Sequence, residues 1–345
     1  MKTHRRVLSS IAAVAALCLG LSGCAGPQSP TTTPSSDTTT ASTSSAPEVT
    51  TFNIGVAVYL AHPALEAVQA GFEEVLKEQG VDYTLDVQNA QGEASNAATI
   101  ASSFASDQSI DLILAIATPM AVAMASAEKD RPILFSAVTD PVKDGLVPSW
   151  DKTGANITGT SDLNPGSNPL GLVKEAVPGA KTVGVLYSSS ESNSLAQVDA
   201  FKEEASGLGV TLKTQAITSA AEVSVGLASL SGVDAILIPT DNVVVASIAS
   251  VIGFGREKKI PVFCSDASTV ELGTVASRTL SYHDLGRSTG EMAVAILRDG
   301  VPLTSIKPQA PAGKELSVNL EAAERYGLTL PDGFAEGAII VKTKS

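Results

Sequence analysis

The sequence predicts an α/β protein of two lobes, each built around its own parallel sheet. The chain has 345 residues, which is enough for two domains with separate cores. Short β-rich runs alternate with amphipathic segments, the pattern typical of parallel sheets. The pattern also occurs twice, because Ile54-Gly55-Val56 matches Val183-Gly184-Val185 at 129 positions later. Together these observations indicate a duplicated open α/β unit.

The chain begins with the features of an export signal. Basic residues precede an apolar run, Val7–Gly20, that is too short to span a bilayer. The following Leu21-Ser22-Gly23-Cys24 resembles a bacterial lipoprotein box. This resemblance implies removal of residues 1–23 and diacylation of Cys24, which would anchor the chain to the extracytoplasmic face of the cell membrane. A plain signal peptide with an incidental cysteine is the alternative.

Residues 24–50 are expected to form a flexible tether. From Ala25 to Thr50, 18 of 26 residues are Ser, Thr or Pro. Such a segment has too few apolar residues to offset the entropy of ordering.

The body begins near Thr51 and contains eight expected strands. Its first helix follows His62, with Pro63 in the first turn and Gly80 as a stop. Two further helices are expected over Val243–Phe254 and Asp284–Arg298, the latter with Asp284 as its cap. The expected strands are Phe52–Val58, Tyr83–Asn89, Asp111–Ala117, Pro132–Val138, Val183–Tyr187, Thr211–Ile217, Ala235–Pro239 and Pro261–Cys264.

Several function classes are disfavoured by composition. The formal charge of −13 and the absence of a basic stripe argue against nucleic acid. With three histidines, a multi-histidine metal site is disfavoured, and no metal or cofactor is expected. Cys264 is the one cysteine expected in the mature fold, so no intrachain disulfide can form there, and its apolar surroundings predict an inert buried thiol.

The candidate ligand site lies at the carboxyl ends of the strands, where open α/β sheets bind ligands. Hydroxyls and helix N-termini there could hold a carboxylate, and Asp241 or Glu191 an ammonium. The near absence of Arg and Lys disfavours phosphate, so the rim predicts a zwitterion. Tyr59, Phe135 and Tyr187 could contact its side chain, as could Tyr282. The candidates are Tyr59, His62, Thr118, Thr139 and Asp140 in the first lobe, and Tyr187, Glu191, Asn193, Ser194, Asp241, Asn242 and Asp266 in the second.

The acidic candidates could also have a purely structural role in place of ligand contact. Asp241-Asn242 could simply cap the helix that follows, and Thr139-Asp140-Pro141 could simply form a turn.

Several of these segments resemble motifs of the tryptophan/tyrosine-type ABC transporter substrate-binding lipoproteins. The resemblance spans about residues 52 to 331. It rests on His62-Pro63-Ala64-Leu65, Ala117-Thr118-Pro119, Ala137–Val142, Gly159–Asp162, Leu186-Tyr187 with Glu191–Ser194, Pro239–Asn242 and Tyr282–Gly286.

The resemblance implies a type I periplasmic-binding-protein fold, with two Rossmann-like lobes, a hinge and a ligand cleft between them. In such a fold, residues 51–160 form the first lobe and 161–279 the second. Residues 280–310 return to the first lobe, and 311–345 cross over again to the second. The chain then changes lobes near Gly159–Asp162, Arg278–Tyr282 and Pro308–Gly313.

The expected function is capture of a small zwitterion, an aromatic amino acid by resemblance, for an ABC importer. The expected partners are an ABC permease and its ATPase, with the receptor acting as a monomer and not as an enzyme. A sensor lipoprotein that presents the ligand to a membrane signalling partner is the first alternative. An extracytoplasmic α/β hydrolase is the second, although neither His62 nor His283 lies in a recognisable hydrolase motif.

Overall fold

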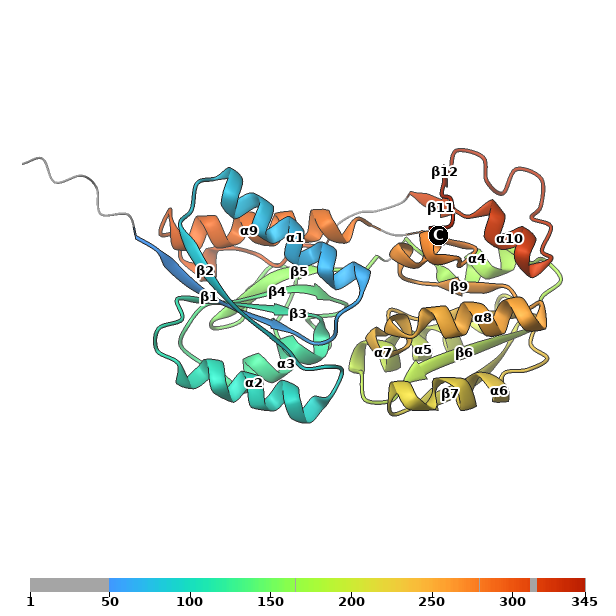
Figure 1. Ribbon diagram of the computed structural model, residues 1–345, viewed down its shortest axis with the longest axis horizontal. Helices are drawn as coiled ribbons and strands as arrows, with labels where there is room; N and C mark the ends of the chain where they lie inside the picture. Colours follow the sequence, from blue (N-terminus) through green and yellow to red (C-terminus); the bar gives the residue numbers. More distant parts are fainter. Residues whose placement is uncertain (1–49, 165, 279, 311–314, 345) are drawn as a thin grey trace, which may run out of the picture. The chain divides into compact units, whose positions relative to one another are not determined.

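The computed structural model describes residues 50–344, except 165, 279 and 311–314 (Figure 1). The predicted signal, Cys24 and nearly all of the tether lie outside the described residues. Within the described part, no helix is both long enough and apolar enough to cross a bilayer.

The first lobe is a five-stranded parallel sheet with strand order β2-β1-β3-β4-β5. Helices α1 and α9 pack together on one face and α2 and α3 on the other (Figure 1). Strands β3 and β4 are buried along their whole length, as their continuous apolar sequences predict. The elements are β1 (Phe52–Val58), α1 (Pro63–Glu78), β2 (Tyr83–Asn89), α2 (Ala94–Ser106), β3 (Leu112–Ile116), α3 (Thr118–Ala127), β4 (Ile133–Val138), β5 (Ile157–Ser161) and α9 (Tyr282–Leu297).

Helix α9 returns to this lobe from late in the sequence and packs very closely against α1. A Cβ atom at Gly71 would lie 2.1 Å from the His283 carbonyl oxygen, and one at Gly286 would lie 2.0 Å from the Val68 carbonyl oxygen. Glycine on both helices therefore permits the close approach of their backbones.

The second lobe contains a four-stranded parallel sheet with strand order β7-β6-β8-β9. This order repeats the β2-β1-β3-β4 order of the first lobe, as expected for duplicated units. The elements are α4 (Pro169–Ala176), β6 (Thr182–Ser188), α5 (Ser192–Ala205), β7 (Thr211–Ile217), η1 (Ala220–Glu222), α6 (Val223–Ser229), β8 (Ala235–Ile238), α7 (Asn242–Ala246), α8 (Ile248–Lys258), β9 (Val262–Cys264) and η2 (Ala267–Leu272).

A small third sheet, which the sequence pattern does not predict, extends the second lobe. It consists of short strands in the order β10-β11-β12, and Val318 and Tyr326 from this region belong to the core of the second lobe. Its elements are β10 (Ala276–Arg278), β11 (Leu316–Val318), α10 (Leu320–Tyr326) and β12 (Ile339–Ile340); η3 (Leu303–Ser305) lies between β10 and β11 in the chain and contacts β5.

Three local expectations are corrected. The helix expected over Val243–Phe254 is interrupted at Ser247, whose φ of −103° and ψ of 14° end α7 before α8 begins. Ser281, not Asp284, caps α9, because its side chain accepts a hydrogen bond from the Asp284 N–H. The segment Ile157–Ser161, which is absent from the expected strands, is β5 and completes the first sheet; the crossover expected near Gly159–Asp162 overlaps its end. The predicted crossover at Pro308–Gly313 falls partly outside the described residues, and the exact lobe boundaries stay predictions.

Candidate functional site

Loops at the carboxyl ends of strands from both lobes meet around one small cavity. The site forms there because parallel strands direct their following loops to one edge of each sheet. The free volume is only about 10 Å³, roughly the space for one water molecule. We call its polar lining the polar cluster: His62, Thr118, Thr139, Asp162, Asn193, Thr240, Asp241, Asn242, Asp266 and Tyr282.

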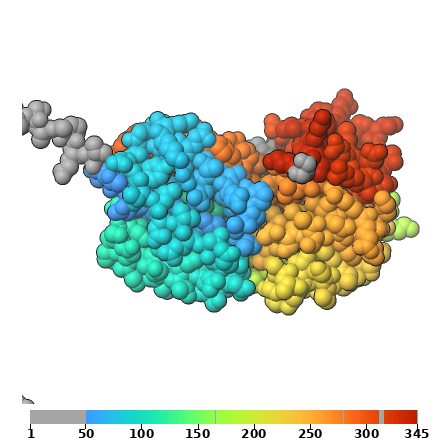
Figure 2. Space-filling view, in the orientation of Figure 1, coloured from blue at the N-terminus to red at the C-terminus, as the bar shows by residue number. Residues whose placement is uncertain are grey.

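The two lobes are in direct contact beside this cluster. His62 Nε2 lies 3.2 Å from Asn242 Oδ1, and both residues are buried. Burial lowers the pKa of His62, so the ring is neutral and Nε2–H donates to the amide oxygen. The space-filling view shows the surfaces of the two lobes abutting (Figure 2). The structure therefore shows the lobes closed on each other.

Glu191 is committed to the fold of the second lobe. It is buried, and its two oxygens accept hydrogen bonds from the backbone N–H groups of Asn242 and Val243 and from the side-chain amides of Asn193 and Asn242. Burial, together with the nearby Asp241 carboxylate, raises the pKa of Glu191. Its role is to bind the start of α7, and it lines neither the small cavity nor the larger one described below.

Asp241 is also fully used within its own lobe. Its Oδ2 accepts from the Ser188 N–H at 2.5 Å and the Ser194 hydroxyl at 2.7 Å, and its Oδ1 accepts from the Val244 N–H at 2.8 Å. The last bond caps α7. The geometry therefore supports the capping interpretation of Asp241 and leaves it little capacity for a ligand ammonium.

Asp162 has a carboxylate oxygen that is free to accept a hydrogen bond or to pair with a cation. It is not among the residues that the sequence predicts for the site. Its Oδ2 accepts from the Tyr282 hydroxyl at 3.1 Å. Its Oδ1 is buried and has no hydrogen-bond partner among the described residues, although the Thr139 hydroxyl lies close enough to help lower the pKa. Burial outweighs these contacts and raises the pKa of Asp162 to about 6. The one sequence signal for it is its place in the Gly159–Asp162 motif.

Asp266 supplies a second carboxyl group to the polar cluster. It is buried, and its Oδ1 accepts from the Ser268 N–H at 2.8 Å. Burial raises the pKa of Asp266 to about 6. The lining of the polar cluster contains no Lys or Arg among the described residues to neutralise either group.

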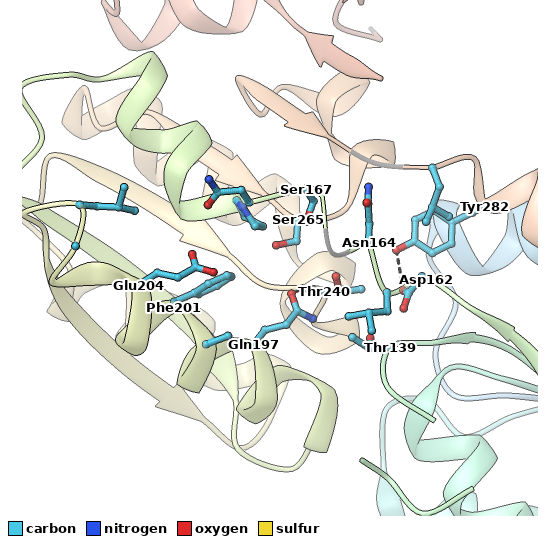
Figure 3. Close-up of a pocket in the computed structure, with 17 residues that line it drawn as sticks. Thr139, Asp162, Asn164, Ser167, Gln197, Phe201, Glu204, Thr240, Ser265 and Tyr282 are labelled. Carbon is cyan, nitrogen blue, oxygen red and sulfur yellow. Dashed lines mark hydrogen bonds between the residues drawn. The ribbon is translucent and has the colours of Figure 1, made fainter. Parts of the chain in front are cut away.

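A much larger cavity adjoins the polar cluster and runs along α5. It measures about 600 Å³ and shares Thr139, Asp162, Thr240 and Tyr282 with the cluster. We call it the α5 cavity. Figure 3 shows the Asp162–Tyr282 pair at one end and Phe201 with Glu204 at the other, with Gln197, Thr240 and Ser265 between them.

Unpartnered polar atoms are concentrated around these two cavities. Among the described residues, buried side-chain atoms without a hydrogen-bond partner include His62 Nδ1 and Asn193 Oδ1 on the cluster. Gln197 Nε2 and Ser265 Oγ, on residues that line the α5 cavity, are also buried and have no hydrogen-bond partner among the described residues. Because burying such atoms unpaired costs about 1–3 kcal/mol each, their concentration here indicates a binding site.

Five predicted site residues line neither cavity: Tyr59, Asp140, Tyr187, Glu191 and Ser194. Tyr59 is fully buried and donates its hydroxyl to the Gly92 carbonyl, and burial raises its pKa to about 12. Asp140 accepts from the Lys143 N–H, as the turn interpretation predicts. Tyr187 packs on the core of the second lobe.

Phe135 and Cys264 both lie in the hydrophobic cores of the lobes. Phe135 lies wholly inside the core of the first lobe, so it is not available to a ligand. Cys264 is a free, buried thiol, and burial raises its pKa well above the usual range, as expected for an inert cysteine. In the described part of the chain, no three His, Cys, Asp or Glu side chains are grouped so as to hold a metal ion.

Comparison with known proteins identifies the family. The model of the family described as "ABC transporter substrate binding protein" matches residues 53–342. The chain belongs to this family. Its members bind a solute, which confirms the prediction that the chain is not an enzyme, and the predicted two-lobed α/β fold is confirmed as well.

Three relatives are informative. A protein named "Tyrosine-binding protein" from Clostridioides difficile is 38% identical over 263 residues, covering 74% of this chain and 76% of the relative. A Streptococcus pneumoniae domain solved in complex with L-Trp is 34% identical, with a TM-score of 0.80, and covers 85% of this chain and 100% of that one. A ligand-free, open substrate-binding protein from Clostridium difficile is 41% identical over the same shares, with a TM-score of 0.61.

The TM-scores of the two solved structures agree with the closed arrangement that the contacts between the lobes indicate. This chain superposes better on the L-Trp complex than on the open, ligand-free structure, although it is more similar in sequence to the latter. A change in lobe arrangement lowers a superposition score without changing either lobe. The lobes of this chain are therefore arranged more as in the L-Trp complex.

Proposed function

We propose that the protein is an extracytoplasmic, lipid-anchored receptor that captures an aromatic amino acid and delivers it to an ABC permease powered by its ATPase. Family membership supports the transport role, and the names of the tyrosine- and tryptophan-binding relatives support the ligand class. We further propose that it acts as a monomer, with residues 161–279 and the C-terminal segment as the second lobe.

The observation that carries the proposal is the pair of buried acids at the junction of the lobes. Asp162 and Asp266 both line the polar cluster, and no Lys or Arg of the described residues lines it or the α5 cavity. A buried carboxylate without a cation is unfavourable. An α-ammonium group would supply the missing charge, and the neutral donors nearby suit an α-carboxylate.

Lobe closure follows from the same geometry. Asp162 follows β5 of the first lobe, whereas Asn193, Thr240 and Asp266 come from the second lobe. A ligand that contacts both sides binds the closed arrangement more tightly and so shifts the population toward it. The closed form is then the one presented to the permease.

The first test is calorimetry of the full chain in detergent with each of the twenty amino acids. We expect L-tyrosine or L-tryptophan to bind with micromolar or better affinity, since about 8 kcal/mol corresponds to 1 μM. The corresponding amines, which lack the carboxylate, and N-acetyl derivatives, which lack the ammonium, are the controls and should bind far more weakly. Absence of heat with every aromatic amino acid would exclude the proposed ligand class.

The lipid anchor is tested by the substitution Cys24→Ser in the native host. Because acyl chains attach through the cysteine sulfur, the variant should move from the membrane fraction to the medium or periplasm. The buried Cys264→Ser variant serves as the matched control and should stay with the membrane. An unchanged membrane fraction for Cys24→Ser, with no lipid detected on the wild type by mass spectrometry, would contradict the anchor.

A further inference from the structure

Asn242 joins the two lobes through a buried amide. Its Nδ2 donates to Glu191 Oε2 within the second lobe, and its Oδ1 lies 3.2 Å from His62 Nε2 of the first lobe. The same Glu191 oxygen accepts from the Asn242 N–H, so it is an acceptor and must face the nitrogen of the amide. The amide oxygen is therefore presented to the first lobe, where it can only accept a hydrogen bond.

The second lobe orients Asn242 by itself. Glu191 binds both the backbone and the side chain of Asn242, and Asp241 caps the helix that Asn242 begins. All of these contacts lie within one lobe, so they do not depend on closure. A group that is already oriented loses little conformational freedom when its partner arrives. Glu191 is therefore a positioning residue for the contact between Asn242 and His62.

The side chain of His62 is not needed by its own lobe. It precedes α1, but it makes no capping hydrogen bond, and Pro63 suits the first turn of that helix. The ring is only 6% exposed. A neutral Nε2–H buried against the second lobe needs an acceptor there, because an unpaired buried donor is unfavourable. Asn242 Oδ1 is that acceptor.

We propose that the His62–Asn242 hydrogen bond is a latch that stabilises the closed arrangement of the lobes without help from the ligand. The latch deepens the proposed function, on which it rests: a ligand that binds the closed arrangement gains affinity in proportion to the fraction of the protein that is already closed. Because the latch acts on the lobes, it raises the affinity for every ligand by the same factor and does not select among ligands.

The first experiment measures closure in the absence of ligand. Spin labels on Ser103→Cys of α2 and Ser224→Cys of α6, both exposed positions, report the distance between the lobes by double electron–electron resonance. The full chain also carries Cys18→Ser and Cys24→Ser, so that the buried Cys264 is the one remaining native cysteine. We expect the label distance of the closed structure to be populated without ligand, and its absence would overturn the proposal.

The second experiment removes the latch. His62→Phe keeps a ring but leaves Asn242 Oδ1 buried without a donor when the lobes close, so the ratio of closed to open protein should fall at least about 5-fold. His62→Gln, whose amide can donate again, should stay within about 3-fold of wild type. In an Asn242→Ala background, His62→Phe should change the ratio by less than about 2-fold, because the partner is already gone. An unchanged ratio in His62→Phe, or the same loss in both backgrounds, would contradict the latch.

Calorimetry separates a latch from a ligand contact. In His62→Phe, L-tryptophan and L-tyrosine should lose affinity by factors that agree within about 2-fold, because both ligands bind the same closed fraction. A loss confined to one of the two would make His62 a ligand contact and overturn the proposal. If wild type binds no aromatic amino acid at all, the proposed function fails, whereas the distances measured without ligand still decide whether the latch exists.

Discussion

Replacing Asp162 with Asn is expected to weaken binding of L-tryptophan or L-tyrosine by about 30- to 150-fold. The substitution removes the negative charge that faces the ligand ammonium, and a hydrogen bond to a charged partner contributes about 2–3 kcal/mol in a buried site. Asn still accepts the Tyr282 hydroxyl bond, so the local fold should persist. Calorimetry on the purified full chain measures the loss, and urea unfolding checks the fold.

The matched control is Asp140→Asn, which alters a carboxylate that lines neither cavity and accepts from the Lys143 N–H. It should leave affinity within about twofold of wild type. If Asp162→Asn also stays within that range, Asp162 is not the ammonium partner.

The pH dependence of binding gives the same substitution a second readout. Burial raises the pKa of Asp162 to about 6 from an ordinary value of 3.8. The folded free protein therefore takes up a proton between pH 6 and 4, so this group makes the free protein more stable as pH falls through that window and less stable as pH rises. Ligand binding needs the carboxylate, so affinity should fall about tenfold per pH unit below pH 6 for this group. Asp162→Asn should flatten that slope, leaving the contribution of Asp266, whose pKa is also raised to about 6.

The framework of the fold can be predicted from the sequence because its central strands carry long apolar runs. Strands such as β3 and β4 are buried on both faces. Because the strands are parallel, the residues that follow them all lie at the carboxyl edge of the sheet. The same rule predicts His62, Thr118 and Asp266 as neighbours, and the structure brings all three into the polar cluster. The short strands β11 and β12, of three and two residues, carry no periodic signal.

The parts of the site that the sequence does not reveal depend on tertiary packing. Asp162 follows β5 at a lobe crossover and has no counterpart in the duplicated strand–helix loops that supply the candidates. Gln197 and Phe201 lie within α5, and a helix pattern cannot show that its face borders a cavity. Tyr59 is the opposite case, a residue that the sequence predicts for the site but that does not line it. It follows a strand end, but its ring is buried and its hydroxyl donates a hydrogen bond to the Gly92 carbonyl.

The sequence alone leaves open whether Asp241 caps a helix or contacts the ligand. The substitution Asp241→Ala distinguishes these two roles. Asp241→Ala would leave the Ser188 N–H, the Ser194 hydroxyl and the Val244 N–H without their acceptor. We expect the free energy of unfolding in urea to fall by about 3–5 kcal/mol, the sum of a lost helix cap and unpaired buried donors. Asp241→Asn, which can still cap Val244 through its amide oxygen, should lose less.

The same variant should affect the ligand only indirectly. Since Asp162 is untouched, the folded fraction of Asp241→Ala should keep L-tryptophan affinity within about 10-fold of wild type, measured at a temperature well below its unfolding midpoint. The reverse result, full stability with abolished binding, would restore Asp241 as the ammonium partner. Stability and affinity measured on one variant therefore distinguish a helix cap from a ligand contact, because a cap acts on the unfolding equilibrium and a ligand contact acts on the binding equilibrium.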